Sequence, residues 1–136
     1  MSDSLENAIR FTIPLHTVSE ANINCHWANK KKKQRKKDAH FFVGAYFNSH
    51  SKGKQITLPC KVILTRIAPR GFDYDNLVAS FKAIRDRLAD KIIPGLAPGR
   101  ADGDERINWE YHQEKGKPNQ YAVRVEIFPF SSYFPS

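Results

Sequence analysis

The stretch that decides the fold is PCKVILTRIAPRGFDYDNLVASFKAIRDRLADKIIPG, residues 59–95. Its first part, residues 59–69, is rich in β-branched residues between two prolines, which predicts a strand. From Leu77 onward the apolar residues fall 4, 3, 4 and 4 positions apart, the spacing of one helix face, at Leu77, Phe81, Ile84, Leu88 and Ile92. Pro94 and Gly95 end that helix. The sequence therefore predicts a strand and a helix that are joined by the acidic motif GFDYDN.

The chain before this stretch predicts one more strand and one long helix. IRFTIP, residues 9–14, reads as a short strand. Residues 26–48 contain no proline and change from Lys-rich to apolar, which favours a helix whose basic half lies in solvent. We expect the apolar half to face inward through Phe42, Ala45 and Tyr46, at i, i+3 and i+4 spacing.

Two further strands are predicted near the end of the chain. INWEYHQ, residues 107–113, and QYAVRVEIF, residues 120–128, both alternate apolar and polar side chains. KGKPN, residues 115–119, carries turn residues and predicts a hairpin turn between them. The fold class is therefore α+β, a single domain over residues 1–136. A small mixed β-sheet packs against a long basic N-terminal helix and a second helix that follows the DxDN motif.

Composition excludes several classes of protein. The 136 residues are 40% hydrophobic and 26% charged, and no apolar run approaches the roughly 18 residues of a membrane span. Residues 1–10 carry acidic side chains and resemble no secretory signal, so we expect a cytoplasmic protein. Cys25 and Cys60 lie 35 residues apart without a CxxC partner, so we expect reduced, buried thiols and no zinc site.

The positive charge is concentrated in one segment. KKKKQRKK, residues 30–37, holds seven of the 22 basic residues and leaves 15 basic against 14 acidic residues elsewhere, for a net charge of +8. Such a cationic stripe favours binding to the phosphate backbone of nucleic acid. The candidate DNA-binding residues in it are Lys30, Lys31, Lys32, Lys33, Arg35, Lys36 and Lys37. The alternatives are a solvated run or an import-like signal; an anionic membrane surface fits less well, since no apolar face flanks the run.

Asp73 and Asp75 admit two interpretations. In an extended segment, side chains two residues apart point the same way, so the two carboxylates would repel unless a cation compensates them. Mg²⁺ or Mn²⁺ prefers such oxygen ligands. Alternatively, Asp75 or Asn76 is the N-cap of the helix and Asp73 is a solvated loop residue. The motif alone does not decide between the two.

A third acidic ligand is available after the helix. The loop ADGDER carries Asp102, Asp104 and Glu105, and it is long enough to return toward Asp73 and Asp75 if the strand at Ile107 lies beside residues 59–68. Three acids around one point favour metal-assisted phosphodiester hydrolysis. The alternative is an ordinary polar turn.

Three basic residues lie near this motif in the sequence. Lys82 is seven residues past Asp75, two helical turns along, and could reach a phosphate oxygen of the transition state. Arg66 and Arg70 precede the acids and could bind backbone phosphates. The simpler interpretation of Lys82 is an exposed lysine without a role.

These residues resemble the RusA-type Holliday junction resolvases of bacteria and phages. The resemblance rests on FDYDNLVASFKAIRDRLAD, the acidic loop and INWEYHQ, and FTIPL, NINCHWANKKKKQRKK and PCKVILTR match the family's order, so it covers nearly the whole chain. It implies a Mg²⁺-dependent homodimeric endonuclease that cuts four-way DNA junctions. Asp73 and Asp75 match the first two metal ligands of the family.

Two positions depart from the family pattern. Some members have their lysine four residues after the second Asp, where this chain has Ala79, so Lys82 takes the role only by helical proximity. The acidic pair of the family falls on Ala101 and Asp102, with Asp104 two residues on, and Asp102 is the favoured third ligand. A dimer fits a twofold-symmetric junction that is cut in two opposed strands. The competing hypotheses are a non-catalytic DNA- or RNA-binding protein and a nuclease for other branched DNA.

Overall fold

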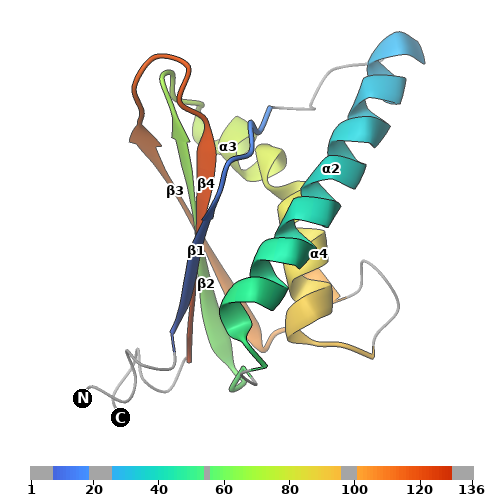
Figure 1. Ribbon diagram of the computed structural model, residues 1–136, viewed down its shortest axis with the longest axis vertical. Helices are drawn as coiled ribbons and strands as arrows, with labels where there is room; N and C mark the ends of the chain where they lie inside the picture. Colours follow the sequence, from blue (N-terminus) through green and yellow to red (C-terminus); the bar gives the residue numbers. More distant parts are fainter. Residues whose placement is uncertain (1–7, 19–25, 54–55, 96–100, 130–136) are drawn as a thin grey trace.

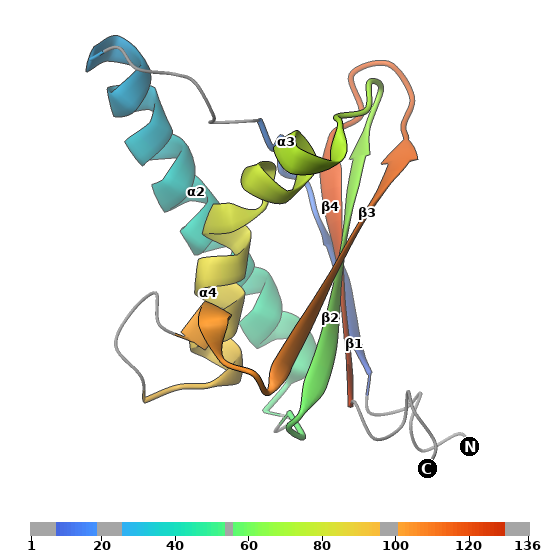
Figure 2. The ribbon, with the colours of Figure 1, turned by 180° about the vertical axis from the view of Figure 1, so that it is seen from behind.

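The protein folds as helices packed against one face of a small sheet (Figure 1). The structure, a computed structural model, describes residues 8–18, 26–53, 56–95 and 101–129, with the backbone alone for residues 26–29 and residue 102. Seen from behind, the helices again lie on one side of the strands (Figure 2). The predicted α+β class, with a mixed sheet and a long N-terminal helix, is confirmed.

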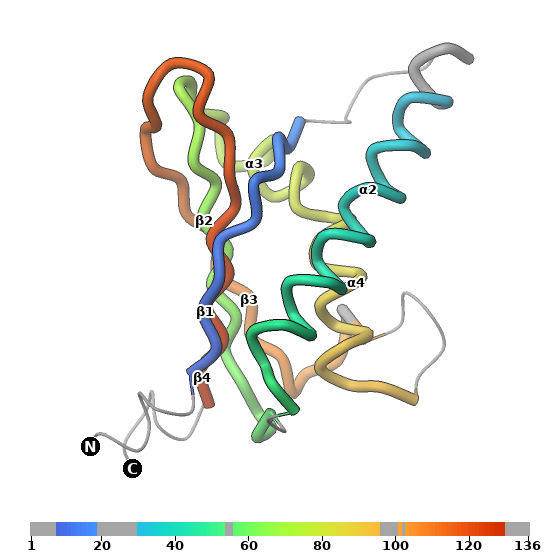
Figure 3. The backbone as a smooth tube through the Cα atoms, viewed as in Figure 1, coloured from blue at the N-terminus to red at the C-terminus, as the bar shows by residue number. Residues whose placement is uncertain are grey.

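The sheet has four strands in the order β1-β4-β2-β3. β2 (Cys60–Ala68) lies between β3 (Ile107–Lys115), to which it is parallel, and β4 (Ala122–Pro129), to which it is antiparallel; β1 (Ile9–Ile13) pairs antiparallel with β4. The hairpin predicted over residues 115–119 is therefore wrong, because β3 and β4 flank β2 and do not pair. The loop between them passes over the end of β2, where the Gly116 N–H donates to the Ala68 carbonyl at 2.8 Å (Figure 3).

The predicted second helix is present but broken. It consists of α3 (Tyr74–Ser80) and α4 (Lys82–Ile92), which meet at Phe81. The Phe81 N–H donates to the Val78 carbonyl, three residues earlier, and the Ser80 hydroxyl donates to the Leu77 carbonyl at 2.7 Å. These bonds end α3, and the helix axis changes direction between α3 and α4. Phe81 is completely buried and stacks on Tyr111. One continuous helix was the wrong prediction at this position.

The apolar periodicity of that helix nevertheless identified its buried face. All five predicted positions from Leu77 to Ile92 are buried. In α2 (His26–Ser51) the inward face is made by Ala39, Val43 and Phe47, with Phe42 and Tyr46 partly buried beside them. Ala45 is exposed, so its predicted inward position is wrong.

The described helices give no sign of a membrane span: none combines the length and the apolar character that crossing a bilayer requires. Cys60 is buried and its thiol is free, as expected, and burial raises its pKa to about 11. Cys25 lies outside the described residues.

Candidate metal and nucleic-acid site

Asp73 is the N-cap of α3 and lies five residues after the last residue of β2, Ala68. Its carboxylate accepts a hydrogen bond from the Asn76 backbone N–H at 3.4 Å and another from the Asn76 side-chain amide. These bonds, the side-chain bond first, lower the pKa of Asp73 below its usual value. The capping interpretation is therefore correct for this motif, but the capping residue is Asp73 and not Asp75 or Asn76. A carboxylate has about four lone-pair positions, so capping leaves Asp73 oxygens able to bind a cation.

Asp75 lies in the first turn of α3 and is exposed. Within the described part of the chain, no hydrogen bond or ion pair holds its carboxylate. Several other acids are paired, for example Glu110 with Lys61 at 2.8 Å and Glu126 with Arg10 at 3.3 Å. Asp75 thus presents an exposed carboxylate that no described residue pairs with.

The turn that carries Asp73 is held against β3 by Gln113. The Gln113 side chain accepts from the Phe72 N–H at 2.9 Å and donates to the Phe72 carbonyl at 2.7 Å. A Cβ atom at Gly71 would lie 3.2 Å from the Gln113 Oε1 atom, so the close approach favours glycine there. Sequence reasoning missed Gln113, because nothing in a single sequence marks a strand residue that bonds to a distant backbone.

Arg66 also holds the turn before Asp73, through contacts with Arg70 and Phe72. It is 5% exposed, donates from Nε to Thr17 Oγ1 at 3.2 Å and from Nη1 to the Arg70 carbonyl at 2.7 Å, and lies 3.7 Å from the centre of the Phe72 ring. The interpretation of Arg66 as a contact to DNA backbone phosphates is therefore wrong, because its guanidinium is enclosed by protein. Arg70 is exposed and remains a candidate.

The third acid does not reach Asp73 and Asp75 within one chain. β3 runs parallel to β2, so the chain must return to the starting end of the sheet before β3 begins. Asp104 lies three residues before Ile107, which pairs with Cys60, whereas the Asp73 turn is bonded to Gln113, six residues further along β3. At roughly 3.3 Å per residue, the separation is about 20 Å. The predicted convergence of Asp104 with Asp73 and Asp75 in one chain is wrong.

Asp104 is also occupied locally. Its two oxygens accept from the Arg106 guanidinium at 3.0 and 2.9 Å, and the Arg106 N–H donates to it at 2.9 Å. The Arg106 side-chain bonds, followed by the backbone bond, lower the pKa of Asp104 to about 2. The backbone of Asp102 lies in the short 3₁₀ turn η1 (Ala101–Gly103) at the same end of the sheet, and its side chain lies outside the described residues.

No group of three or more His, Cys, Asp or Glu side chains suited to a metal ion forms among the described residues. Asp73 and Asp75 still fit Mg²⁺ or Mn²⁺ chemically, because Mg²⁺ commonly takes one or two carboxylates and completes its shell with waters and substrate phosphates. The described residues of one chain therefore supply two candidate ligands, Asp73 and Asp75, and do not form a complete metal site.

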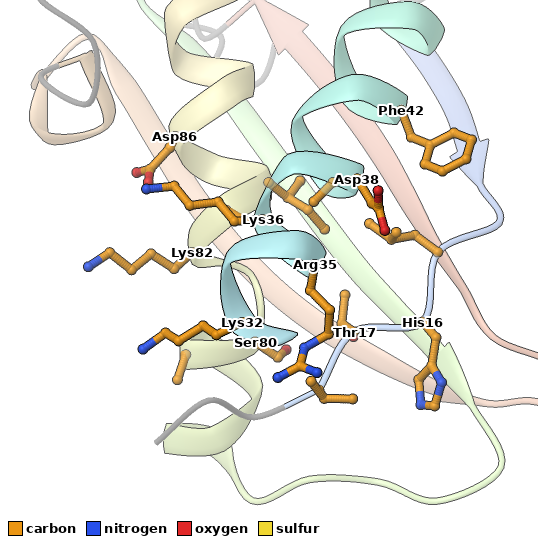
Figure 4. A pocket seen from close by; sticks show the side chains of 16 residues that line it. His16, Thr17, Lys32, Arg35, Lys36, Asp38, Phe42, Ser80, Lys82 and Asp86 are labelled. Atoms are coloured by element: carbon orange, nitrogen blue, oxygen red, sulfur yellow. The ribbon is translucent and has the colours of Figure 1, made fainter. Parts of the chain in front are cut away.

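The basic segment lies in α2, beside α3. Lys30, Lys31, Lys32, Lys33, Lys36 and Lys37 are exposed, and Arg35 is partly buried. Lys32, Arg35 and Lys36 line a cavity of about 710 Å³, and α3 and α4 contribute Ala79, Ser80 and Lys82 to its wall (Figure 4). The exposed lysine predicted to assist catalysis, Lys82, thus shares a cavity with the basic helix. Lys82 was predicted to lie on the same helix face as Asp75 because one continuous helix was expected. The break at Phe81 places the two residues on different helices, so that reason no longer holds.

Comparison with known proteins adds no family to this geometry. No protein-family model matches the sequence, and no curated protein matches it either. The function must therefore be argued from the residues themselves.

Proposed function

We propose that this protein is a Mg²⁺-dependent endonuclease, with Mn²⁺ as an alternative ion, that cuts branched DNA as a homodimer. Holliday junctions are the expected substrate, in recombination and repair. The observation that carries the proposal is the pair Asp73 and Asp75: two exposed carboxylates, neither in an ion pair with a described residue. They lie at the start of α3, whose last residues, Ala79 and Ser80, line a cavity that also contains Lys32, Lys36 and Lys82, in a protein with a net charge of +8. Lysines that hold phosphates and carboxylates that hold a divalent ion are the two parts of such a site.

Each of the candidate residues has a separate role in this proposal. Asp73 and Asp75 would hold the ion, and Gln113 would fix the turn that presents them. When bound, the ion supplies a nucleophilic hydroxide and neutralises the scissile phosphate. Lys82 and the α2 lysines would position the DNA backbone from the cavity side.

A second copy of the chain can complete the ligand set. β3 is an edge strand of the described sheet, and an edge strand can pair with the same strand of another copy about a twofold axis. Antiparallel pairing would bring the start of one β3, with Asp102 and Asp104 just before it, beside the end of the other β3, where Gln113 holds the Asp73 turn. The parallel topology that separates the acids in one chain thus favours their meeting between two. Asp104 would then have to exchange Arg106 for the ion, which favours Asp102 as the third ligand.

The assay is cleavage of a synthetic four-way junction in Mg²⁺, compared with a fork and a linear duplex. We expect paired nicks in the junction, none in EDTA, and none with Asp75→Asn, which should still bind the junction. Undiminished cleavage by Asp75→Asn would refute the assignment of the site. A preference for the fork would keep the chemistry and replace the substrate.

A non-catalytic nucleic-acid-binding protein is the second candidate. The capping role of Asp73 and the ion pair of Asp104 with Arg106 favour it, because both acids then have structural work without a metal. Under this alternative Mg²⁺ changes neither the DNA nor the melting temperature of the protein. A metal site instead raises the melting temperature by ligand linkage as Mg²⁺ is added.

A further inference from the structure

The cavity between α2, α4 and residues 15–18 has two kinds of wall. Its apolar side is made by Leu15, Val18, Ala39, Phe42, Ala79, Ala83 and Ile84. Its rim carries Lys32, Arg35, Lys36 and Lys82, against two acids, Asp38 and Asp86. Figure 4 shows the Lys32 and Lys82 side chains extending toward the same side, with Phe42 at the opposite end of the cavity. A ligand that matches both walls needs a flat apolar body and a negatively charged group.

A buried cation adds to the positive field at this cavity. Arg66 is 5% exposed and donates to Thr17, which lines the cavity wall. Within the described part of the chain, no carboxylate forms an ion pair with the Arg66 guanidinium; its partners are a hydroxyl, a carbonyl and the Phe72 ring. An anion near Thr17 would therefore gain from a charge that the protein does not neutralise.

The size of the cavity suits one nucleotide. A volume of about 710 Å³ falls within the roughly 300–1,000 Å³ of small-ligand sites. In a duplex, both faces of a paired base are covered by the neighbouring base pairs. Only an unpaired base can therefore lie flat against an aromatic ring. A fork with an unpaired residue at its branch offers such a base directly, and a four-way junction offers one when a base pair at the crossover opens.

We propose that this cavity receives one unpaired nucleotide from the branch point, with its base against Phe42 and its phosphates at Lys32, Lys36 and Lys82. The proposal rests on the proposed function, since it takes branched DNA as the ligand. It gives a physical reason for choosing a branch over a linear duplex: the duplex has no free base to place in the cavity.

The test measures the contribution of the base alone. A forked DNA with one unpaired thymidine at the branch is compared, by fluorescence anisotropy in EDTA, with the same fork carrying an abasic residue there. We expect the wild-type protein to bind the thymidine fork about tenfold more tightly, as one base stacked on an aromatic ring provides. In Phe42→Leu, which keeps apolar packing, the two forks should bind within twofold of each other.

Phe41→Leu is the matched control. Phe41 is the neighbouring ring on the same helix, is 70% exposed and does not line the cavity, so its replacement should preserve the tenfold ratio. For the charges, Lys32→Gln/Lys36→Gln should weaken binding of the fork more than Lys33→Gln/Lys37→Gln, which alters two lysines of the same helix that are also exposed but do not line the cavity.

Three results would overturn the proposal. Equal binding of the two forks by the wild-type protein would show that no base is received. Equal losses from the two lysine pairs would make α2 a general cationic surface. Competition by thymidine monophosphate at the concentration of the fork would make the cavity a site for free nucleotides. Because binding is measured without metal, a failure of cleavage leaves this test intact, and cleavage with equal binding of the forks refutes the cavity alone.

Discussion

The side-chain amide of Gln113 closes a two-bond ring with the backbone of Phe72, at 2.9 and 2.7 Å. This contact joins the third strand of the chain to the residue immediately before Asp73. The Arg66 guanidinium packs against the Phe72 ring. The position of the candidate metal ligands thus depends on Gln113 and Arg66, which hold the preceding residue, Phe72.

Replacing Gln113 by Leu should reduce cleavage more than it reduces stability. Losing two partly solvated hydrogen bonds should cost about 1–2 kcal/mol of unfolding free energy, whereas a displaced ligand pair should lower the cleavage rate by roughly 10²-fold. Urea unfolding and junction cleavage measure the two effects. Gln120→Leu is the control, because Gln120 Oε1 accepts from the Lys117 N–H at 2.8 Å in a neighbouring loop. A similar loss of activity in both variants would contradict a positioning role.

Arg66→Met should destabilise the protein without a specific loss of DNA binding. We expect about 2–3 kcal/mol less unfolding free energy, because charged hydrogen bonds to Thr17 and Arg70 disappear in a buried place. Arg70→Gln, at an exposed position, should leave stability within about 0.5 kcal/mol and weaken junction binding. Urea unfolding and binding titrations should therefore separate the two arginines. A folded, fully stable Arg66→Met that fails to bind DNA would restore the phosphate-contact interpretation.

Asp73 and Asp75 should respond differently to removal of the side chain. Asp73→Ala should lower the melting temperature because α3 loses its cap. Asp75→Ala removes no hydrogen bond or ion pair with a described residue and should lower the melting temperature less than Asp73→Ala does. Equal melting temperatures for the two variants would contradict the cap assignment. Asp75 is consequently the cleaner position for testing catalysis.

The pair Asp104 and Arg106 should give a stability increment that depends on acidity. The folded pKa of Asp104 is about 2, below the ordinary value of 3.8, so the ionised carboxylate favours the folded state. Its contribution is complete above the unfolded value and is lost as the pH falls from about 4 to about 2. In a carboxyl-carbon NMR titration, Arg106→Met should move the pKa of Asp104 up toward 3.8. An unchanged value would exclude Arg106 as the cause.

The periodicity of apolar residues predicted where the helices and strands lie better than it predicted which strands pair with each other. The spacing from Leu77 to Ile92 located a buried helix face, and alternation located β3 and β4. Alternation and turn residues define a strand and a turn, but they do not choose a partner, so the loop at residues 115–119 was predicted as a hairpin although β2 lies between the strands. The inward position predicted for Ala45 was wrong because the buried face of this 26-residue helix was placed through Phe42. The buried residues lie one position further on, in the row that includes Val43.

The candidate site was predicted in part. The motif at Asp73 was found because two acids lie one residue apart between a predicted strand and a predicted helix in a basic chain. The convergence with Asp104 failed because adjacency of two strands was inferred without their direction, and parallel strands start at the same end. The roles of Gln113 and Arg66 depend on their contacts with Phe72, which is distant from Gln113 in the sequence, and no local sequence pattern predicts these contacts.

The central claim is that carboxylates from opposite ends of the fold act in one site formed by two copies. Asp75→Asn and the double variant Asp102→Asn/Asp104→Asn are prepared separately, and four-way-junction cleavage in Mg²⁺ is measured for each and for their mixture. We expect each alone to be inactive and the mixture to regain about a quarter of the wild-type sites, cutting one strand per junction, since a mixed dimer holds one intact set of ligands. A mixture that stays inactive while the wild-type protein cuts would contradict the claim.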